Sequence, residues 1–218
     1  MDQEQQDNLD SKSMTTDPRR LALRSRLSIH FTSAGYPERH YKALEEEYKK
    51  TGMPWLYWEE PTTESLLGAA KALKEGDCML VMIGPRGTGK TQAAVEMAMK
   101  LDAHMLNSDK EITHLYTPLG ELLAGEKASW EDKMMPSPLK KAKQVGLLVL
   151  DEIQESSASD WERQQLTLLI DERYRSMKRT ILIGNLNPKG LEDFLSKSVA
   201  SRLRETGTII EMTGKRYR

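Results

Sequence analysis

The chain has 218 residues, of which 38% are apolar and 30% are charged, and its formal net charge is −1. These values predict one globular domain plus a short additional segment, with a highly charged surface. The single cysteine, Cys78, excludes an internal disulfide, and no cluster of Cys and His residues has the spacing of a metal site. The near-neutral charge argues neither for nor against a nucleic-acid partner, so any basic surface must be local.

The N-terminus lacks the apolar segment of a secretion signal, and no apolar stretch approaches the length of a membrane span. We therefore expect a cytoplasmic protein with no membrane partner. Residues 1–20 are polar and show no apolar period, which predicts a disordered or loosely attached segment. Residues 21–31 carry apolar residues at a spacing nearer two than 3.6, so both a strand and a short helix remain open.

A domain boundary is expected near residue 60. Residues 38–50 are strongly charged and predict a surface helix, whereas prolines at both ends of residues 54–61 argue against a helix there. We therefore divide the chain into an N-terminal extension, residues 1–60, and a main domain, residues 61–218.

The main domain alternates between apolar runs and segments of helical period. Ser159 and Glu162 match a capping box at the start of one helix. Strands alternating with helices predict an α/β fold with three layers, in which helices cover both faces of a parallel sheet. The predicted strands are 78–83, 112–116, 146–150, 180–184 and 208–212, and Cys78 is expected to be a buried structural thiol. The predicted helices are 63–74, 90–101, 118–123, 159–177, 191–195 and 198–204.

Residues 84–91 match the P-loop pattern G-x-x-x-x-G-K-[ST] in full. Glycines let successive backbone N–H groups turn around phosphate oxygens, and the following helix adds the positive end of its dipole. A glycine-rich turn that only resembles a P-loop is the alternative, and the buried strand before it and the helix after it argue against that. We expect ATP and Mg²⁺ as ligands, with Lys90 on the β- and γ-phosphates and the Thr91 hydroxyl on the metal. The expected nucleotide-binding residues are Gly84, Pro85, Arg86, Gly87, Thr88, Gly89, Lys90, Thr91 and Gln92.

Two further apolar strands end in polar side chains. Asp151 and Glu152 follow the strand at 146–150, so their carboxylates are expected at the carboxyl edge of the sheet, where open α/β folds bind ligands. Asp151 is predicted to hold Mg²⁺, and Glu152 to orient or polarise the attacking water. Asn185 ends the next strand and could contact the γ-phosphate or that water, although asparagine also favours turns for local reasons.

These motifs together resemble the DnaC/IstB group of AAA+ ATPases, which includes bacterial and phage helicase loaders and transposition helper ATPases. The resemblance covers about residues 35–218 and rests on the following segments: Asp151-Glu-Ile, Trp161-Glu-Arg, Asp171-Glu-Arg-Tyr174, Thr180-Ile-Leu-Ile-Gly-Asn-Leu186, Ser201-Arg202-Leu203, and Thr213-Gly-Lys-Arg-Tyr-Arg218, where Arg216 replaces the family's serine. The six residues after Met212 are too few for the helical lid of most AAA+ proteins, and the group lacks that lid.

The resemblance implies that Arg202 is an arginine finger, acting in trans on nucleotide bound by a neighbouring subunit. Hydrolysis would then depend on self-association and would be weak in the isolated subunit. Arg218 is implied to be a nucleotide sensor. A solvated arginine on a helix is the alternative reading of Arg202.

In the family, an insertion before the acidic strand faces single-stranded DNA. Here that region carries Trp130 and the lysines Lys127, Lys133, Lys140, Lys141 and Lys143, which suit phosphate contacts and base stacking. A solvated lysine-bearing helix and loop is an equally good reading, because acidic residues dilute the charge.

The resemblance favours an ATP-dependent loader that binds a hexameric DnaB-type helicase through residues 1–60 and helps place it on DNA. A transposition helper ATPase that binds duplex DNA shares every motif and remains an alternative. So does a nucleotide-binding adaptor with little hydrolysis.

Overall fold

The computed structural model describes residues 31–51, 62–75, 79–106, 113–132, 134–155 and 159–213. The predictions for residues 1–20 and 54–61, the choice of structure for 21–30, and the thiol of Cys78 lie outside these residues. Within the described residues, no helix is both long and apolar enough to cross a lipid bilayer.

A sheet of five parallel strands forms the centre of the fold, in the order β2-β3-β4-β1-β5. The predicted α/β fold with a parallel sheet is therefore confirmed. The strands are β1 (Met79–Ile83), β2 (His114–Pro118), β3 (Leu147–Asp151), β4 (Arg179–Gly184) and β5 (Gly207–Glu211).

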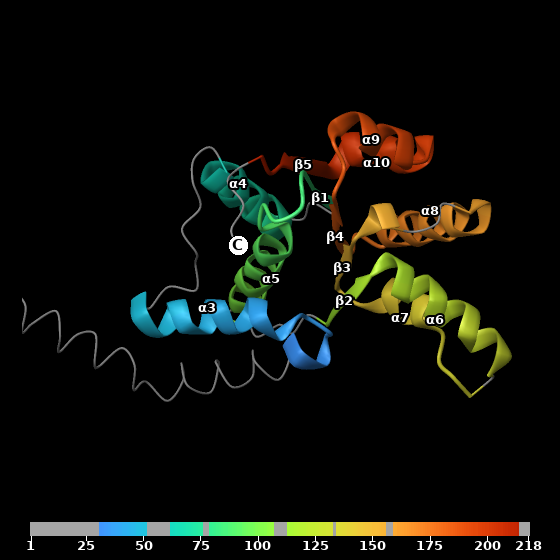
Figure 1. Ribbon diagram of the computed structural model, residues 1–218, viewed down its shortest axis with the longest axis horizontal. Helices are drawn as coiled ribbons and strands as arrows, with labels where there is room; N and C mark the ends of the chain where they lie inside the picture. Colours follow the sequence, from blue (N-terminus) through green and yellow to red (C-terminus); the bar gives the residue numbers. More distant parts are fainter. Residues whose placement is uncertain are drawn as a thin grey trace, which may run out of the picture.

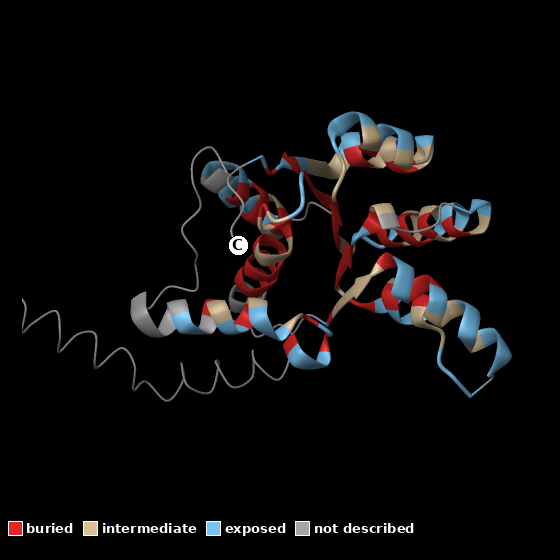
Figure 2. Cartoon of the chain, viewed as in Figure 1, coloured by how far each residue is buried: buried red, intermediate tan, exposed pale blue. Residues whose placement is uncertain are grey.

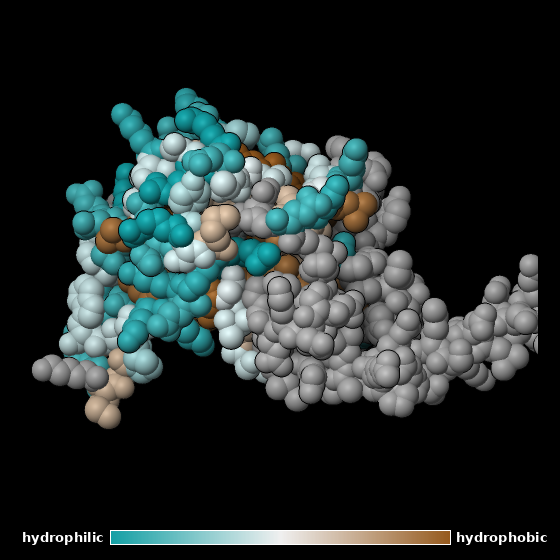
Figure 3. Space-filling model, turned by 180° about the vertical axis from the view of Figure 1, so that it is seen from behind, coloured by the Kyte–Doolittle hydropathy of each residue, from teal (hydrophilic) through white to brown (hydrophobic). Residues whose placement is uncertain are grey.

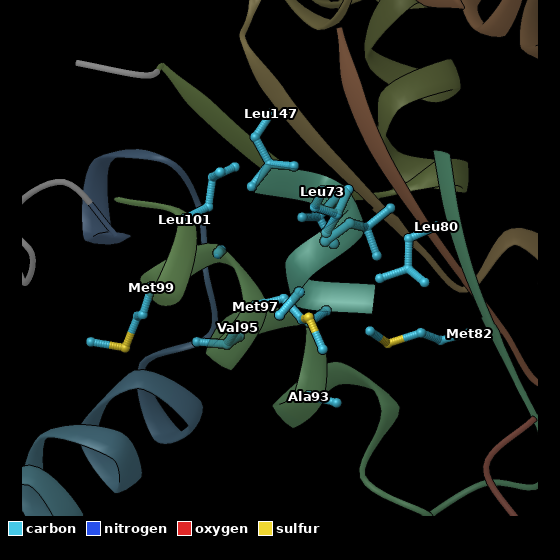
Figure 4. Packing of buried hydrophobic residues seen from close by; sticks show 14 of the residues in the cluster. Leu73, Leu80, Met82, Ala93, Val95, Met97, Met99, Leu101 and Leu147 are labelled. Atoms are coloured by element: carbon cyan, nitrogen blue, oxygen red, sulfur yellow. The ribbon is translucent and has the colours of Figure 1, made fainter. Parts of the chain in front are cut away.

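The interior strand β1, between β4 and β5, is buried on both faces, which explains its uninterrupted apolar sequence. Because side chains alternate along a strand, Met79, Val81 and Ile83 enter one core, whereas Leu80 and Met82 enter the other. Figure 4 shows Leu80 and Met82 among side chains from the helices on their side of the sheet.

Helices cover both faces of the sheet (Figure 1). One face carries α3 (Glu38–Thr51), α4 (Thr62–Glu75) and α5 (Lys90–Leu106). The other carries α6 (Leu119–Glu131), α7 (Pro138–Gln144), α8 (Asp160–Arg175), α9 (Pro188–Phe194) and α10 (Lys197–Thr206), with the 3₁₀ turn η1 (Ile153–Glu155) after β3. Figure 2 shows that most helices bury the sides that face the sheet and expose their outer sides, whereas α5 is buried over residues 93–101. Seen from behind, the described surface is mostly hydrophilic, with small separate apolar patches (Figure 3).

Residues 31–44 belong to the same core as α4, α5 and one face of the sheet. Phe31, Tyr41 and Leu44 are buried there, although the sequence suggested an N-terminal extension for this part. The backbone N–H of Tyr116 in β2 donates to the Ala34 carbonyl at 2.7 Å. The expected boundary near residue 60 lies outside the described residues and stays a prediction.

Two elements between β2 and β3 differ from the sequence prediction. The helix expected at 118–123 begins one residue later and continues to Glu131. The helix α7, which we did not assign, contains several lysines, whose charges hid its buried side, Leu139 and Ala142. It begins where the Ser137 hydroxyl accepts a hydrogen bond from the Lys140 N–H, with Pro138 in the first turn.

The capping residue predicted for α8 is confirmed. The Ser159 hydroxyl accepts a hydrogen bond from the Glu162 N–H at 3.3 Å. The Glu162 carboxylate also accepts from Lys127 of α6 at 3.2 Å, so the start of α8 is tied to its neighbouring helix.

Arg173 of α8 is fully buried and joins three elements of the second core. Its Nε donates to the Thr180 hydroxyl at 2.9 Å, and its Nη1 donates to the carbonyls of Ala142 and Val145 at 2.7 and 2.8 Å. Its Nη2 donates to the Arg179 carbonyl at 2.5 Å. Burial lowers the pKa of Arg173 to about 9, so the guanidinium stays charged at neutral pH. It satisfies carbonyls at the end of α7 that would otherwise be buried without a partner.

We predict that Arg173→Lys lowers the free energy of unfolding by about 3 kcal/mol, because one ammonium cannot satisfy all the acceptors of a planar guanidinium. Urea unfolding followed by circular dichroism measures the change. Arg175→Lys is the matched control, since Arg175 is exposed on the same helix, and we expect a change within about 0.5 kcal/mol. Equal stability of the two variants would contradict the anchoring role of Arg173.

Candidate active site

The loop from Gly84 to Gly89 connects buried β1 to the first residue of α5, Lys90. Gly84, Gly87 and Gly89 have φ angles of 135°, 84° and 87°, which L side chains rarely adopt. A Cβ atom on Gly84 would lie 2.2 Å from the Met212 carbonyl oxygen. The loop is therefore a close-packed glycine turn at a helix N-terminus, which is the geometry that binds phosphate.

The ammonium of Lys90 lies across this loop. Its Nζ donates to the carbonyls of Gly84 and Pro85 at 2.8 and 2.6 Å. Burial lowers the pKa of Lys90, and the Asp151 carboxylate opposes that shift. To contact a bound phosphate, Lys90 has to exchange these carbonyl partners for phosphate oxygens.

The Asp151 carboxylate accepts hydrogen bonds from three groups. Its Oδ1 accepts from the Glu152 N–H at 2.7 Å. Its Oδ2 accepts from the Thr91 hydroxyl at 2.8 Å and from the Tyr116 hydroxyl at 2.6 Å. The structure thus brings together Thr91 and Asp151, the two residues expected to hold the metal, although metal binding itself stays a prediction.

A magnesium ion fits this pair of ligands. A threonine hydroxyl and a carboxylate are the hard oxygen donors that Mg²⁺ prefers. Among the described residues, no group of three or more His, Cys, Asp or Glu side chains could hold a metal ion. The remaining ligands of an ion beside Thr91 and Asp151 would therefore be phosphate oxygens and water, as is usual for Mg²⁺.

Glu152 and Asn185 follow neighbouring strands at the same edge of the sheet. Glu152 is exposed and has a φ angle of 53°, an unusual backbone conformation of the kind that clusters at functional sites. The Asn185 N–H donates to the side-chain oxygen of Gln154 at 2.8 Å. Gln154, which sequence reasoning missed, therefore joins the turn after β3 to the end of β4.

Sequence reasoning also missed Tyr116, although it predicted a strand that ends at this residue. Its place at the end of a predicted strand was the available signal, because the carboxyl ends of parallel strands share one edge of the sheet. Burial raises the pKa of Tyr116, and the Asp151 charge adds to the shift. The phenol therefore stays protonated at neutral pH and donates the hydrogen bond to Asp151.

Gln92, expected among the nucleotide-binding residues, directs its amide to α3. Its Nε2 donates to the His40 carbonyl at 3.1 Å, and its Oε1 lies 2.7 Å from His40 Nδ1. Burial lowers the pKa of His40, and the contact with Gln92 opposes that shift. His40 therefore joins the N-terminal part of the fold to the helix that follows the P-loop.

Arg202 lies on α10 and is 22% exposed. Its Nη1 lies 3.0 Å from Asp171 Oδ1 and donates to the Ser198 carbonyl at 3.0 Å, while its guanidinium lies 5.3 Å from the centre of the Tyr174 ring. These partners belong to α8 and α10. The structure does not bring Arg202 to its own P-loop, and a role in trans stays a prediction.

Four of the five lysines predicted to contact DNA lie on α6 and α7, which pack side by side and project from the sheet (Figure 1). Lys140 and Lys141 are exposed, whereas Lys127 pairs with Glu162. Trp130 is 59% exposed and packs edge-on against Trp161, with ring centroids 5.2 Å apart. Lys143 is half-buried, and both Lys133 and Arg218 lie outside the described residues.

The family model described as "AAA domain (dynein-related subfamily)" matches residues 79–203. The replicative helicase loader DnaC of Buchnera aphidicola is 26% identical over 138 residues, which are 62% of this chain and 54% of that protein. The tRNA dimethylallyltransferase of Pseudarthrobacter chlorophenolicus is 30% identical over 106 residues, which are 49% of this chain and 32% of that enzyme. The chain thus spans about half the length of the DnaC relative and a third of the transferase.

Solved structures share the fold at low sequence identity. A crystal structure of the DnaC helicase loader superposes with a TM-score of 0.64 at 20% identity and covers 81% of this chain and 100% of that chain. The replication initiator DnaA bound to AMPPCP and single-stranded DNA superposes with a TM-score of 0.62 at 18% identity, covering 83% and 52% of the two chains.

Proposed function

Because the AAA domain model matches more than half of its residues, this chain belongs to the AAA family, and we propose that it is an ATP-dependent loader of a replicative helicase. The observation that carries the proposal is the contact between Thr91 and Asp151 beside a glycine-lined P-loop. The similarity to DnaC supports the choice of helicase loading among the many functions of this fold.

The proposed reaction is the hydrolysis of ATP to ADP and phosphate. The loop N–H groups and Lys90 bind the phosphate oxygens, and Thr91 with Asp151 would hold Mg²⁺, which neutralises phosphate charge when it is bound. Glu152 orients a water molecule and accepts its proton as the water oxygen attacks the γ-phosphorus. The bond to the β–γ bridging oxygen breaks and ADP leaves. Asn185 contacts the γ-phosphate or the attacking water.

The place of Arg202 supports weak hydrolysis in the isolated subunit. The side chain is held by Asp171 and Tyr174 on the α8–α10 face. In the proposed oligomer, that face of one subunit adjoins the P-loop of the next, and Arg202 supplies positive charge to the γ-phosphate in trans. Self-association therefore controls turnover.

We place a single-stranded DNA contact on the projecting α6–α7 hairpin. Lys140 and Lys141 offer charge to phosphates, and exposed Trp130 offers an aromatic face or edge for a base. The neighbouring Met134 is 89% exposed, so the tip offers an apolar contact as well.

We assign helicase binding to residues 1–60. The packing of Phe31, Tyr41 and Leu44 in the core restricts the segment that a binding test can remove. Deleting all sixty residues would remove these three core residues, whereas deleting residues 1–30 keeps them. The cytoplasm, where replication takes place in bacteria, is the compartment that suits these partners.

We predict that the purified chain, with ATP and Mg²⁺, forms a defined complex with the DnaB-type helicase of its own source, and that deletion of residues 1–30 abolishes the complex. Light scattering coupled to gel filtration measures the stoichiometry. Binding of a fluorescent ATP analogue by the truncated chain is the control for folding. ATP-dependent filaments on duplex DNA without a helicase complex would instead identify a transposition helper. Helicase binding with no turnover under any condition would identify an adaptor.

We predict that Arg202→Ala and Glu152→Gln each lower ATP turnover, by roughly a thousandfold for the arginine. An equal mixture of the two variants should regain about a quarter of the wild-type rate at saturating protein, since one interface in four then joins an intact Glu152 to an intact Arg202. Arg204→Ala, an exposed arginine of the same helix, is the control and should keep its activity. No recovery in the mixture would rule out the action in trans.

We predict that Lys140→Ala with Lys141→Ala weakens binding of single-stranded oligonucleotides. The slope of log affinity against log salt should fall in magnitude by about 1.4, because each lost phosphate contact on a single strand accounts for about 0.7. Fluorescence anisotropy over a salt series measures this slope. The double variant of Lys189 and Lys197, exposed lysines near α9 and α10, should leave it unchanged. Equal slopes for both double variants would show that the hairpin is a solvated surface.

A further inference from the structure

The structure assigns Tyr116 as a positioning residue for the Asp151 carboxylate. This assignment rests on the proposed ATPase function and deepens it, because it adds a residue that none of the nucleotide-binding motifs contains. The hydroxyl of Tyr116 lies 2.6 Å from Asp151 Oδ2, within the site proposed for the metal.

Tyr116 differs from the other two groups that hold Asp151. Thr91 belongs to the P-loop helix and is itself expected to contact the metal, and the Glu152 N–H is the next group along the chain. Tyr116 comes from the neighbouring strand β2, where it pairs in register with Val149. Its hydroxyl is therefore the contact that fixes the carboxylate from outside the phosphate-binding elements.

The orientation of Asp151 matters because Mg²⁺ requires nearly ideal octahedral geometry. Without the Tyr116 hydroxyl, the Oδ2 atom keeps one donor, Thr91, which also has to face the metal. The carboxylate then gains rotational freedom that has to be lost again on metal binding. Loss of a hydrogen bond that orients a metal ligand typically weakens metal affinity by about 10- to 100-fold.

Tyr116 is itself held by residues 34–36. Its N–H donates to the Ala34 carbonyl at 2.7 Å, and its ring lies 5.4 Å from the ring of Tyr36. Gly35, with a φ angle of 86°, approaches so closely that a Cβ atom there would lie 2.8 Å from the Tyr116 carbonyl oxygen. These contacts fix the backbone and ring of Tyr116, so its hydroxyl is held in position beside the Asp151 carboxylate.

A purely structural explanation is that the hydroxyl only satisfies a half-buried phenol. Tyr116→Phe would then lower stability without changing metal affinity. Tyr36→Phe is a matched control, since Tyr36 packs against Tyr116 and its hydroxyl faces His114, at 3.4 Å, and not Asp151.

The test measures the Mg²⁺ concentration that half-saturates tight binding of a fluorescent ATP analogue, together with analogue affinity in EDTA and thermal unfolding. For Tyr116→Phe we expect the half-saturating Mg²⁺ concentration to rise by about 10-fold or more, with affinity in EDTA within about twofold of wild type. Tyr36→Phe should leave both binding measurements unchanged, whatever its effect on stability.

An unchanged Mg²⁺ requirement in Tyr116→Phe, or an equal change in Tyr36→Phe, would overturn the assignment while leaving the proposed function intact. Failure of the unaltered chain to bind the analogue would overturn the proposed function and the assignment together.

Discussion

The three inner strands of the sheet, β3, β4 and β1, are buried on both faces, so they offer polar groups to solvent at their ends. Because all five strands are parallel, their carboxyl ends lie along one edge. The P-loop, the Asp151–Glu152 pair and Asn185 lie at the same edge for this reason, although Thr91 and Asn185 are 94 positions apart in the chain. Alternate side chains of β1 enter the two cores, so this strand joins the helices on both faces of the sheet beside the P-loop.

The elements that depend on residues close together in the sequence were predictable. Apolar runs identified the strands, and the glycines of the P-loop identified a turn that L side chains rarely adopt. Strand β2 spans His114–Pro118, whereas the prediction was 112–116. The prediction stopped before Pro118, but a proline at the end of an edge strand does not interrupt the pairing. Helix α7 escaped prediction since its two buried residues are separated by lysines.

The contacts that sequence reasoning missed join segments that are distant in the chain. Tyr116 and Asp151 are 35 residues apart, and His40 and Gln92 are 52 residues apart. A single sequence records neither pairing, because each depends on how strands are ordered and on where α3 packs. Arg173 is a similar case, as its acceptors are mostly backbone carbonyls that carry no residue-type signal. The motifs thus indicate the chemistry of the site, whereas the side chains that orient it become visible in three dimensions.

The attachment of α3 beside the P-loop has a thermodynamic consequence. Residues 34–40 contact both Tyr116 and Gln92, and each of these adjoins or contacts an expected metal ligand. Any molecule that displaces this segment would change the free energy of nucleotide binding, and reciprocity then requires nucleotide to change the affinity for that molecule by the same factor. A coupling of 1.4 kcal/mol, about one strong hydrogen bond, would correspond to a tenfold change in both affinities.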